Sequence, residues 1–296
     1  MSNLIKLAKI IDLEEITVDV YQSNRLSKQW WAKMGTDIDQ AVKTPKMGAG
    51  IKVCVLDTGA GIHKELDIKG GVNFTTEDAN DYIDRQGHGT HVCGIISQIA
   101  PECEIHVVKV LADNGSGQMD WIMKGIEYAI DIGASVINMS LGSSTYYGPL
   151  HNLVKLAVRK GIVICAAAGN ESDNDVETEE FSYPGALHEV ISVGSVNRKQ
   201  GLSKFSNTNR EVDIVAPGEH IYSLAPNDKY VVLSGTSMAT PFVAGITALV
   251  LAERPDLDPD GVRELLEKSA TDAGDPGYDF GFGNGIINLD KLLDLV

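Results

Sequence analysis

Three short stretches of this 296-residue chain hold the residue types that nucleophilic catalysis requires. Asp57 follows an apolar run, His88 stands between two glycines, and Ser237 precedes a long segment of small and apolar residues. A serine hydroxyl is a weak nucleophile unless a base accepts its proton and a third group orients that base. The chain supplies one acid, one base and one hydroxyl, so folding could assemble them into a single relay.

Each of these residues also has an ordinary structural interpretation. Asp57 could cap a helix or stabilise a turn, and Ser237 could be a helix N-cap, which is a common role for serine. His88 and His91 could share a metal ion, but metal-binding histidines on a helix normally stand four apart with an acidic residue between them. The sequence therefore predicts no metal site, and it favours catalysis because all three reactive types occur together.

The elements that must position these residues alternate along the chain. Continuous apolar runs, which are typical of parallel strands covered on both faces, occur at 51–56, 105–110, 134–139, 161–168, 190–194 and 212–215. Helical spacing occurs at 119–132, 149–160, 238–251 and 260–269, and Asp258 can cap the last of these with Pro259 in its first turn. The alternation predicts a single α/β domain of three layers, with a mostly parallel, doubly wound sheet between helices.

This architecture gives each reactive residue a place. Asp57 would lie at the carboxyl edge of the sheet, where α/β folds build their sites. The glycines beside His88 would let the chain turn and leave the imidazole exposed at a helix start, with His91 in a structural role one turn further on. Ser237 would lie at a helix N-terminus, where the helix dipole favours an anion that forms beside it.

The charge balance limits the partners. The chain has 25 Lys and Arg against 41 Asp and Glu, a formal net charge of −16, and no basic patch is visible. Such a surface repels phosphate backbones and anionic lipids. We therefore expect a peptide or protein substrate and neither nucleic acid nor a membrane as a partner. The oligomeric state is open, and a homodimer is among the alternatives.

Cysteine usage and the N-terminus indicate the compartment. The four cysteines form no Cys-x-x-Cys pair and are expected to be small buried thiols: Cys54, Cys93, Cys103 and Cys165. Lys6, Lys9 and Asp12 interrupt the first apolar residues before a secretory segment can form. Both features favour a cytoplasmic location.

Three motifs carry a resemblance to a known family. Val-Leu-Asp-Thr-Gly at 55–59, His-Gly-Thr-His-Val at 88–92 and Gly-Thr-Ser-Met-Ala-Thr-Pro at 235–241 resemble the signatures of the subtilisins, in the same Asp, His, Ser order. The resemblance runs from about residue 51 to the C-terminus. It is strongest in character to the intracellular subtilisins. It implies a serine endopeptidase that hydrolyses peptide bonds through an acyl-enzyme, in intracellular protein turnover or precursor processing.

The resemblance also assigns further site residues. It makes Asn170 the oxyanion-stabilising side chain, whereas Asn after Gly would otherwise indicate only a turn. It implies a groove in which an extended peptide adds as a strand. The residues expected to form that groove are Gly115, Gly117, Ser140, Leu141, Gly142, Ala168, Gly169 and Ser182, with Tyr183 and Glu171 beside the primary pocket.

The chain departs from many secreted relatives in two places. Residues 95–101 run straight towards the next strand without a calcium-binding loop, so the strongest calcium site of the family should be missing and Glu65 left without partners. Structural calcium could still bind elsewhere, and catalysis is expected to need no cofactor. Residues 1–45 form an N-terminal extension or wrapping segment, of which we expect residues 4–11 to cover the active site until cleaved, and residues 46–296 form the peptidase domain.

Two other functions remain to be weighed. A binding module could keep the fold without cleaving, but all three reactive residue types are present. Another serine hydrolase, such as an esterase, would normally carry a Gly-x-Ser-x-Gly elbow around its nucleophile, and Ser237 lacks one.

Overall fold

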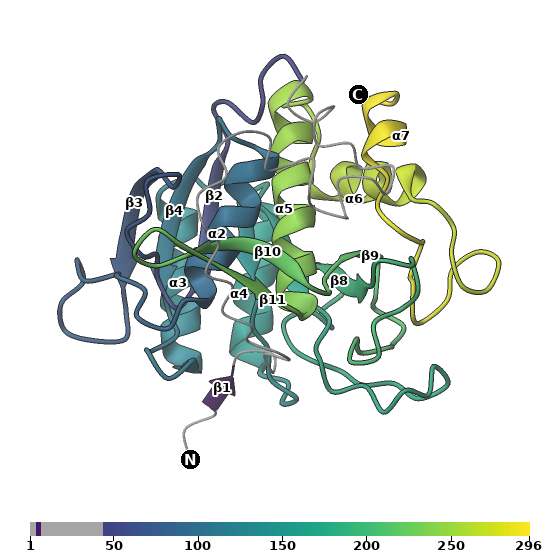
Figure 1. Cartoon of the computed structure of the whole chain (residues 1–296), viewed down its shortest axis with the longest axis horizontal. Helices are drawn as coiled ribbons and strands as arrows, with labels where there is room; N and C mark the ends of the chain where they lie inside the picture. Colours follow the sequence, from purple (N-terminus) through teal and green to yellow (C-terminus); the bar gives the residue numbers. More distant parts are fainter. Residues whose placement is uncertain (1–3, 7–43) are drawn as a thin grey trace.

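A seven-stranded parallel sheet forms the centre of the protein (Figure 1). The computed structural model describes residues 4–6 and 44–296. The strand order is β3-β4-β2-β6-β7-β8-β9, and every neighbouring pair is parallel. The strands are β2 (Lys52–Asp57), β3 (Ile68–Asn73), β4 (Glu104–Lys109), β6 (Val136–Met139), β7 (Val163–Ala167), β8 (Ile191–Val196) and β9 (Ile214–Pro217).

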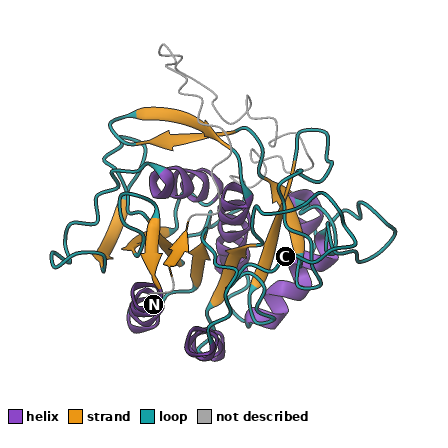
Figure 2. Ribbon diagram, turned by 90° about the horizontal axis from the view of Figure 1, so that it is seen from below, coloured by secondary structure: helices purple, strands orange, loops and turns teal. Residues whose placement is uncertain are grey.

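Helices cover both faces of this sheet, which confirms the predicted three layers (Figure 2). The helices α2 (His88–Ile99) and α5 (Thr236–Glu253) pack on one face, and α3 (Met119–Asp131) and α4 (Gly148–Arg159) pack on the other. Side chains alternate along a strand, so Val53 and Val55 join the core around α2 and α5 while Cys54 and Leu56 join the core around α3 and α4. Burial on both faces is the reason that the strand sequences are continuously apolar.

The helix that carries Ser237 is buried on all sides. In the part of the chain that the structure describes, α5 is the one helix long and apolar enough to cross a membrane by length and composition, and 94% of that stretch is buried inside the molecule. Small residues allow its close packing. A Cβ atom added to Gly245 would lie 2.9 Å from Cβ of Ile99 at the end of α2, so the helices that carry Ser237 and His88 press directly against each other.

Two further helices follow α5. The helix α6 (Pro259–Ser269) starts as predicted, because Asp258 Oδ1 accepts a hydrogen bond from the Gly261 N–H at 2.8 Å. The short helix α7 (Leu289–Leu293) begins after Asn288 and packs against α6. Both contribute apolar side chains to the core around α2 and α5.

A β-hairpin lies outside the helix layer, over α2 (Figure 2). Its strands are β10 (Ile221–Ala225) and β11 (Lys229–Leu233), and they pair antiparallel. The turn between them places Asn227 at a φ of 64° and Asp228 at 58°, a conformation that these two residue types tolerate better than most. The sequence analysis predicted neither this hairpin nor β3.

One short strand belongs to the N-terminal extension predicted at residues 1–45. The strand β1 (Leu4–Lys6) pairs antiparallel with β5 (Ser116–Gln118), with Leu4 opposite Gln118 and Lys6 opposite Ser116. The rest of the predicted extension, residues 1–3 and 7–43, lies outside the described residues.

Candidate active site

The predicted site residues gather at the carboxyl edge of the sheet. Asp57 is the last residue of β2, Ser140 follows β6 and Asn170 follows β7. After β2 the chain builds β3 and β4 on one side of that strand, and it then builds β6 on the other side. The carboxyl ends of β2 and β6 therefore lie at a topological switch point, where α/β sheets bind their ligands.

Asp57 and His88 form a buried pair. His88 Nδ1 lies 2.8 Å from Asp57 Oδ1 and 3.0 Å from Oδ2, and neither side chain is exposed. The carboxylate also accepts a hydrogen bond from the Thr58 N–H at 2.7 Å, which offsets part of the cost of its burial. Because the carboxylate can only accept a hydrogen bond, Nδ1 of the neutral imidazole carries the proton and Nε2 is the acceptor.

The expectation that the His88 imidazole is exposed was wrong. His88 begins α2 as predicted, and Gly87 before it has a φ of 105°, but the residue is only 1% exposed. The ring is turned inward onto Asp57 at the end of β2 instead of outward into solvent. Its Nε2 atom is buried and has no hydrogen-bond partner among the described residues.

Ser237 is the second residue of α5 and is held against the end of β6. Its hydroxyl donates a hydrogen bond to the Ser140 carbonyl oxygen at 3.3 Å, and the Ser140 hydroxyl donates to the Ser237 carbonyl oxygen at 2.9 Å. The Ser237 hydroxyl is thus not hydrogen-bonded to His88 in this structure. The strands β2 and β6 are neighbours and α2 packs on α5, so the elements that carry the hydroxyl and the imidazole lie side by side.

Asn170 lies beside the start of α5. Its Oδ1 atom accepts hydrogen bonds from the Thr236 N–H and the Thr236 hydroxyl, both at 2.9 Å. Its Nδ2 atom lies near the turn before the helix, since a Cβ added to Gly235 would be 3.3 Å from it. The fold therefore brings an amide donor and the N–H groups at the start of α5 to one place, which is the arrangement that stabilises an oxyanion.

Two other sets of titratable groups are structural. His91 is fully buried, its Nε2 lies 2.9 Å from the Ile221 carbonyl oxygen, and burial lowers its pKa to about 3. The predicted structural role of His91 is confirmed. All four cysteines are free and buried, as predicted, and burial raises the pKa of the thiols to about 12 for Cys54, Cys103 and Cys165, and well above its usual value for Cys93.

The predicted groove residues fall into two groups. The first lies in and before β5 and around residues 142 and 182. Gly117 lies in β5, opposite Ile5, and Gly115 forms the turn before β5 with a φ of 75°. Gly142 and Ser182 are in contact, because a Cβ on Gly142 would lie 2.1 Å from Ser182 Oγ. The strand β5 is paired with β1 here, and the role of these four residues in substrate binding stays a prediction.

In the second group, the backbone groups of Ala168 and Gly169 form hydrogen bonds within the protein. The Ala168 N–H donates to the Val193 carbonyl oxygen at 3.0 Å, and the Gly169 carbonyl oxygen accepts from the Asn207 N–H at 3.1 Å. Glu171, predicted beside the pocket, accepts from the Asn170 N–H through Oε2 at 2.9 Å. These particular backbone groups are already paired. Leu141 is fully buried, and the Tyr183 backbone pairs with Ser143.

One expectation about calcium can be corrected. The helix α2 runs without interruption to Ile99, but Glu65 is not without partners, because Tyr230 donates a hydrogen bond to its Oε1 at 2.6 Å. Tyr230 lies on β11, in the hairpin that the sequence analysis did not predict. Within residues 4–6 and 44–296, no group of three or more His, Cys, Asp or Glu is placed to hold a metal ion.

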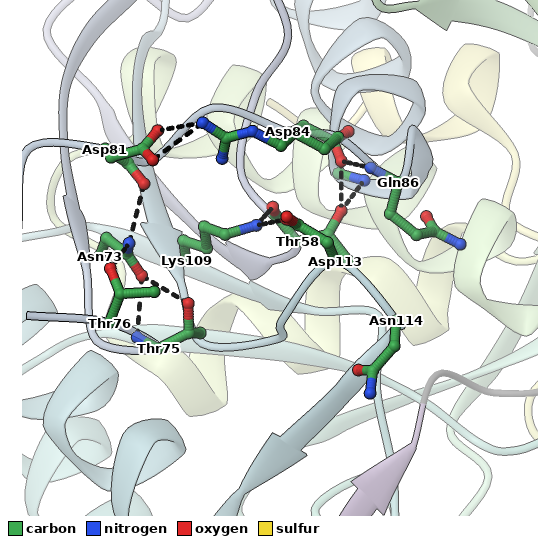
Figure 3. A network of polar contacts seen from close by, with 12 residues as sticks. Thr58, Asn73, Thr75, Thr76, Asp81, Asp84, Gln86, Lys109, Asp113 and Asn114 are labelled. Atoms are coloured by element: carbon green, nitrogen blue, oxygen red, sulfur yellow. Dashed lines mark hydrogen bonds and ion pairs between the residues drawn. The ribbon is translucent and has the colours of Figure 1, made fainter. Parts of the chain in front are cut away.

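Sequence reasoning missed the polar residues that surround the pair of Asp57 and His88. Lys109 ends β4, is 2% exposed, and donates hydrogen bonds to the Thr58 carbonyl oxygen at 2.5 Å and to Asp113 Oδ1 at 2.8 Å (Figure 3). Asp84 is also buried and contacts Thr58. A carboxylate three residues before Gly87, at a helix start without a capping side chain, was a signal that could have identified Asp84.

Comparison of the sequence with known proteins identifies the family of this chain. Residues 48–285 match the model of the subtilase family, peptidase S8. The chain is 44% identical over 276 residues to an intracellular serine protease of Paenibacillus polymyxa, covering 86% of this chain and 84% of that protein. It is 48% identical over 233 residues to the major intracellular serine protease of Bacillus subtilis, covering 71% and 73%, and 41% identical over 252 residues to subtilisin E of Bacillus subtilis, covering 82% and 65%. The resemblance seen in the three motifs is confirmed, and the chain belongs to the subtilase family.

Proposed function

We propose that Asp57, His88 and Ser237 are the catalytic triad of this protein. Membership of the subtilase family makes the chain a subtilisin-type serine endopeptidase, and the proposal concerns which residues perform the chemistry. One observation carries it: His88 Nδ1 lies 2.8 Å from Asp57 Oδ1 in a buried site, which fixes the tautomer in which Nε2 accepts a proton.

The reaction is acyl transfer from a peptide bond to Ser237 and then to water. The Ser237 hydroxyl turns from the Ser140 carbonyl towards His88 Nε2 and attacks the substrate carbonyl carbon while its proton moves to the imidazole. The imidazolium, stabilised by Asp57, gives that proton to the leaving amine. Water then hydrolyses the acyl-enzyme by the same route in reverse.

The oxyanion of the tetrahedral intermediate is assigned to two donors, the Asn170 side-chain amide and the Ser237 N–H. The hydrogen bonds from Thr236 to Asn170 Oδ1 support this assignment, because they fix the orientation of the amide whose Nδ2 is the proposed donor. The start of α5 adds the positive end of its helix dipole at the same place.

Replacement of the nucleophile tests the triad. Ser237→Ala should lower kcat on the order of 10⁶-fold, the loss found when subtilisin loses its own triad serine. A fluorophosphonate should label the wild-type protein on the peptide that contains Ser237 and leave this variant unlabelled. Ser97→Ala is the control, because that hydroxyl contacts only the Gly94 carbonyl within α2, and it should keep normal turnover. Near-normal turnover by Ser237→Ala would falsify the assignment.

Asn170 can be tested apart from the triad. Asn170→Ala should lower kcat on the order of 10²–10³-fold and leave KM nearly unchanged, because the donor acts on charge that develops in the transition state. Asn170→Asp keeps the acceptor for Thr236 but has no N–H to donate, so it should show a similar loss with the start of α5 intact. A rise in KM at normal kcat would place Asn170 in substrate binding instead.

The substrate class is proposed to be extended peptide or protein. We further propose that the N-terminal extension occupies the same edge until it is cleaved. The antiparallel pairing of β1 with β5 supports this, because residues of β5 are among those expected to bind substrate. A chain of residues 46–296 should cleave a peptide faster than the full-length protein, and equal rates would refute the proposal.

The cellular role is proposed from the relatives. Two of them are named intracellular serine proteases, which supports a cytoplasmic location with protein turnover or precursor processing as the task. Catalysis is proposed to need no cofactor. Turnover that persists after extensive dialysis against a chelator supports this, and a loss that calcium restores contradicts it.

A further inference from the structure

A buried carboxylate beside the triad has every acceptor position filled. Asp84 is 2% exposed. Its Oδ1 atom accepts hydrogen bonds from the Thr58 hydroxyl at 2.9 Å, the Gln86 N–H at 3.0 Å and the Gly87 N–H at 2.7 Å. Its Oδ2 atom accepts from the Thr90 N–H at 2.9 Å and the Thr90 hydroxyl at 2.5 Å. A buried carboxylate is costly unless it is paired in this way, so its position is tightly fixed.

These partners belong to the two elements that carry the acid and the base of the triad. Gly87 and Thr90 flank His88 at the start of α2, and Thr58 follows Asp57 at the end of β2. Figure 3 shows Asp84 and Thr58 pointing towards each other. The carboxylate therefore ties the helix that holds the imidazole to the strand that holds its orienting acid.

Thr58 transmits this link to Asp57. Its N–H donates to Asp57 Oδ1 at 2.7 Å, while its hydroxyl donates to Asp84 and accepts from the Gly89 N–H at 2.9 Å. Its carbonyl oxygen accepts from the buried ammonium of Lys109. Every polar group of Thr58 is thus used, and an unbroken hydrogen-bonded path runs from Asp84 to Asp57.

The start of α2 depends on the same carboxylate. Gly87 occupies the N-cap position and supplies no side-chain hydrogen bond to the helix. Helix starts normally need an acceptor for their free N–H groups, and a negative charge there is stabilised by the helix dipole. Asp84 supplies both from outside the helix, through the Gly87 and Thr90 N–H groups.

We propose that Asp84 is a positioning residue for catalysis: acting through Thr58, it sets the placement of the His88 imidazole between Asp57 and Ser237. This inference rests on the proposed triad. Among the described residues, Asp84 makes no hydrogen bond to the imidazole or to the nucleophile, so its contribution should be visible in the turnover step and not in substrate binding.

Two near-isosteric variants test the proposal. Asp84→Asn presents Nδ2 to the Thr90 N–H, so one acceptor is lost, and Thr58→Val removes the hydroxyl that joins Asp84 to β2 and Gly89. Each should lower kcat on the order of 10- to 100-fold with KM unchanged within about twofold, because small misplacements of catalytic groups reduce rate more than binding. The kcat of the double variant should be little lower than that of the less active single variant, because both changes break the same path.

A spectroscopic readout separates positioning from folding. The proton that His88 Nδ1 shares with Asp57 should give a strongly deshielded NMR resonance, and this resonance should move or broaden in both variants. Asp258→Asn is the matched control, because Asp258 caps α6 and has no link to the triad. Asparagine caps a helix about as well as aspartate, so this variant should leave the thermal midpoint nearly unchanged, together with kcat and the shifted resonance.

Several outcomes would overturn the proposal. Unchanged kcat in the folded Asp84→Asn protein, or losses that multiply in the double variant, would show that Asp84 does not act through Thr58. If Asp84→Asn fails to fold, Thr58→Val still tests the proposal. Normal turnover and an unmoved resonance in Thr58→Val would show that the path through Thr58 does not position the imidazole. An error in the triad assignment itself would be seen separately, because Ser237→Ala would then keep normal turnover.

Discussion

The helices α2 and α6 begin in opposite ways. At α6 the cap is local, because Asp258 accepts from the Gly261 N–H three residues later and Pro259 occupies the first turn. At α2 the N-cap is Gly87, which offers no side chain, and the first N–H groups are bound by Asp84 and Gln86 from the preceding turn and by Thr58 from the end of β2. The start of α6 is held by a local cap, whereas the start of α2 is held by its preceding turn and also by a residue of another strand.

This difference follows from what each helix must do. α6 carries no residue of the proposed triad, so a shift of its start by a fraction of an ångström should change turnover little. α2 must hold an imidazole within hydrogen-bond distance of Asp57, so contacts across the fold fix its start. A helix start that serves catalysis is therefore expected to be bound from outside, and the predictions below test that contrast.

The largest expected effect comes from one methyl group at the start of α2. A Cβ at Gly89 would lie 2.2 Å from the Gly59 carbonyl oxygen and 3.2 Å from Asp57 Oδ1, both fixed groups at the end of β2. Gly89→Ala should push α2 away from the strand, lowering kcat on the order of 100-fold or more and the free energy of unfolding by about 3 kcal/mol. Peptide cleavage kinetics and urea denaturation measure both effects.

The same substitution in α6 is the control. A Cβ at Gly261 would meet Asp258 Oδ1 and the Leu257 side chain at 3.2 Å, and both can adjust. Alanine is the better helix former, so Gly261→Ala should change the free energy of unfolding by less than about 1 kcal/mol and leave kcat unchanged. Equal damage from the two substitutions would remove the contrast between the helices.

An intermediate effect is expected from pH. Burial lowers the pKa of His91 to about 3, below its unfolded value of 6.5, so above that unfolded value both states are neutral and no difference arises. As the pH falls, the unfolded chain binds a proton that the folded protein refuses, and stability is lost until the folded pKa is reached. The cost should be about 2 kcal/mol at about pH 5.

Urea denaturation across this pH range measures that cost. In His91→Gln the free energy of unfolding should depend less steeply on pH, with a slope that corresponds to nearly one proton fewer taken up on unfolding. The control is His188→Gln, because the His188 side chain is 88% exposed and solvent reaches it in both states. An identical pH dependence in wild type and His91→Gln would contradict the account of His91 as a buried neutral ring.

The smallest effect is expected at the start of α6. Asp258→Ala removes a local cap and should lower the free energy of unfolding by about 1 kcal/mol. Turnover, measured well below the thermal midpoint, should match that of the wild type. A fall in kcat would mean that α6 reaches the active site, contrary to its separation from the triad in the fold.

The same contrast explains how far the sequence could be interpreted. The strands β2, β4, β6, β7, β8 and β9 were predicted because burial on both faces leaves continuous apolar runs, and α6 because its cap is local. β3 was missed because Gly70 and Gly71 interrupt its apolar residues. The hairpin of β10 and β11 was missed although its turn holds Asn227 and Asp228, since no helix lies between the two strands to mark the alternation.

The candidate site shows the same division. Asp57, His88 and Ser237 could be proposed from residue type, motif and order, and the structure brings their elements together. The burial of His88 and the partner of Glu65 could not be predicted, because both depend on how distant segments pack. Lys109 and Asp84 look like ordinary surface charges in the sequence, and only the folded contacts show that they are buried.

The state of the four thiols has a practical consequence. Alkylating reagents, peroxide and exchanging disulfides all react with thiolate, whereas these four cysteines are buried and burial raises the pKa of their thiols. The native enzyme should therefore be indifferent to the redox poise around it. Modification should begin only when the chain opens, so thiol labelling would count unfolded molecules and report the onset of self-digestion in storage.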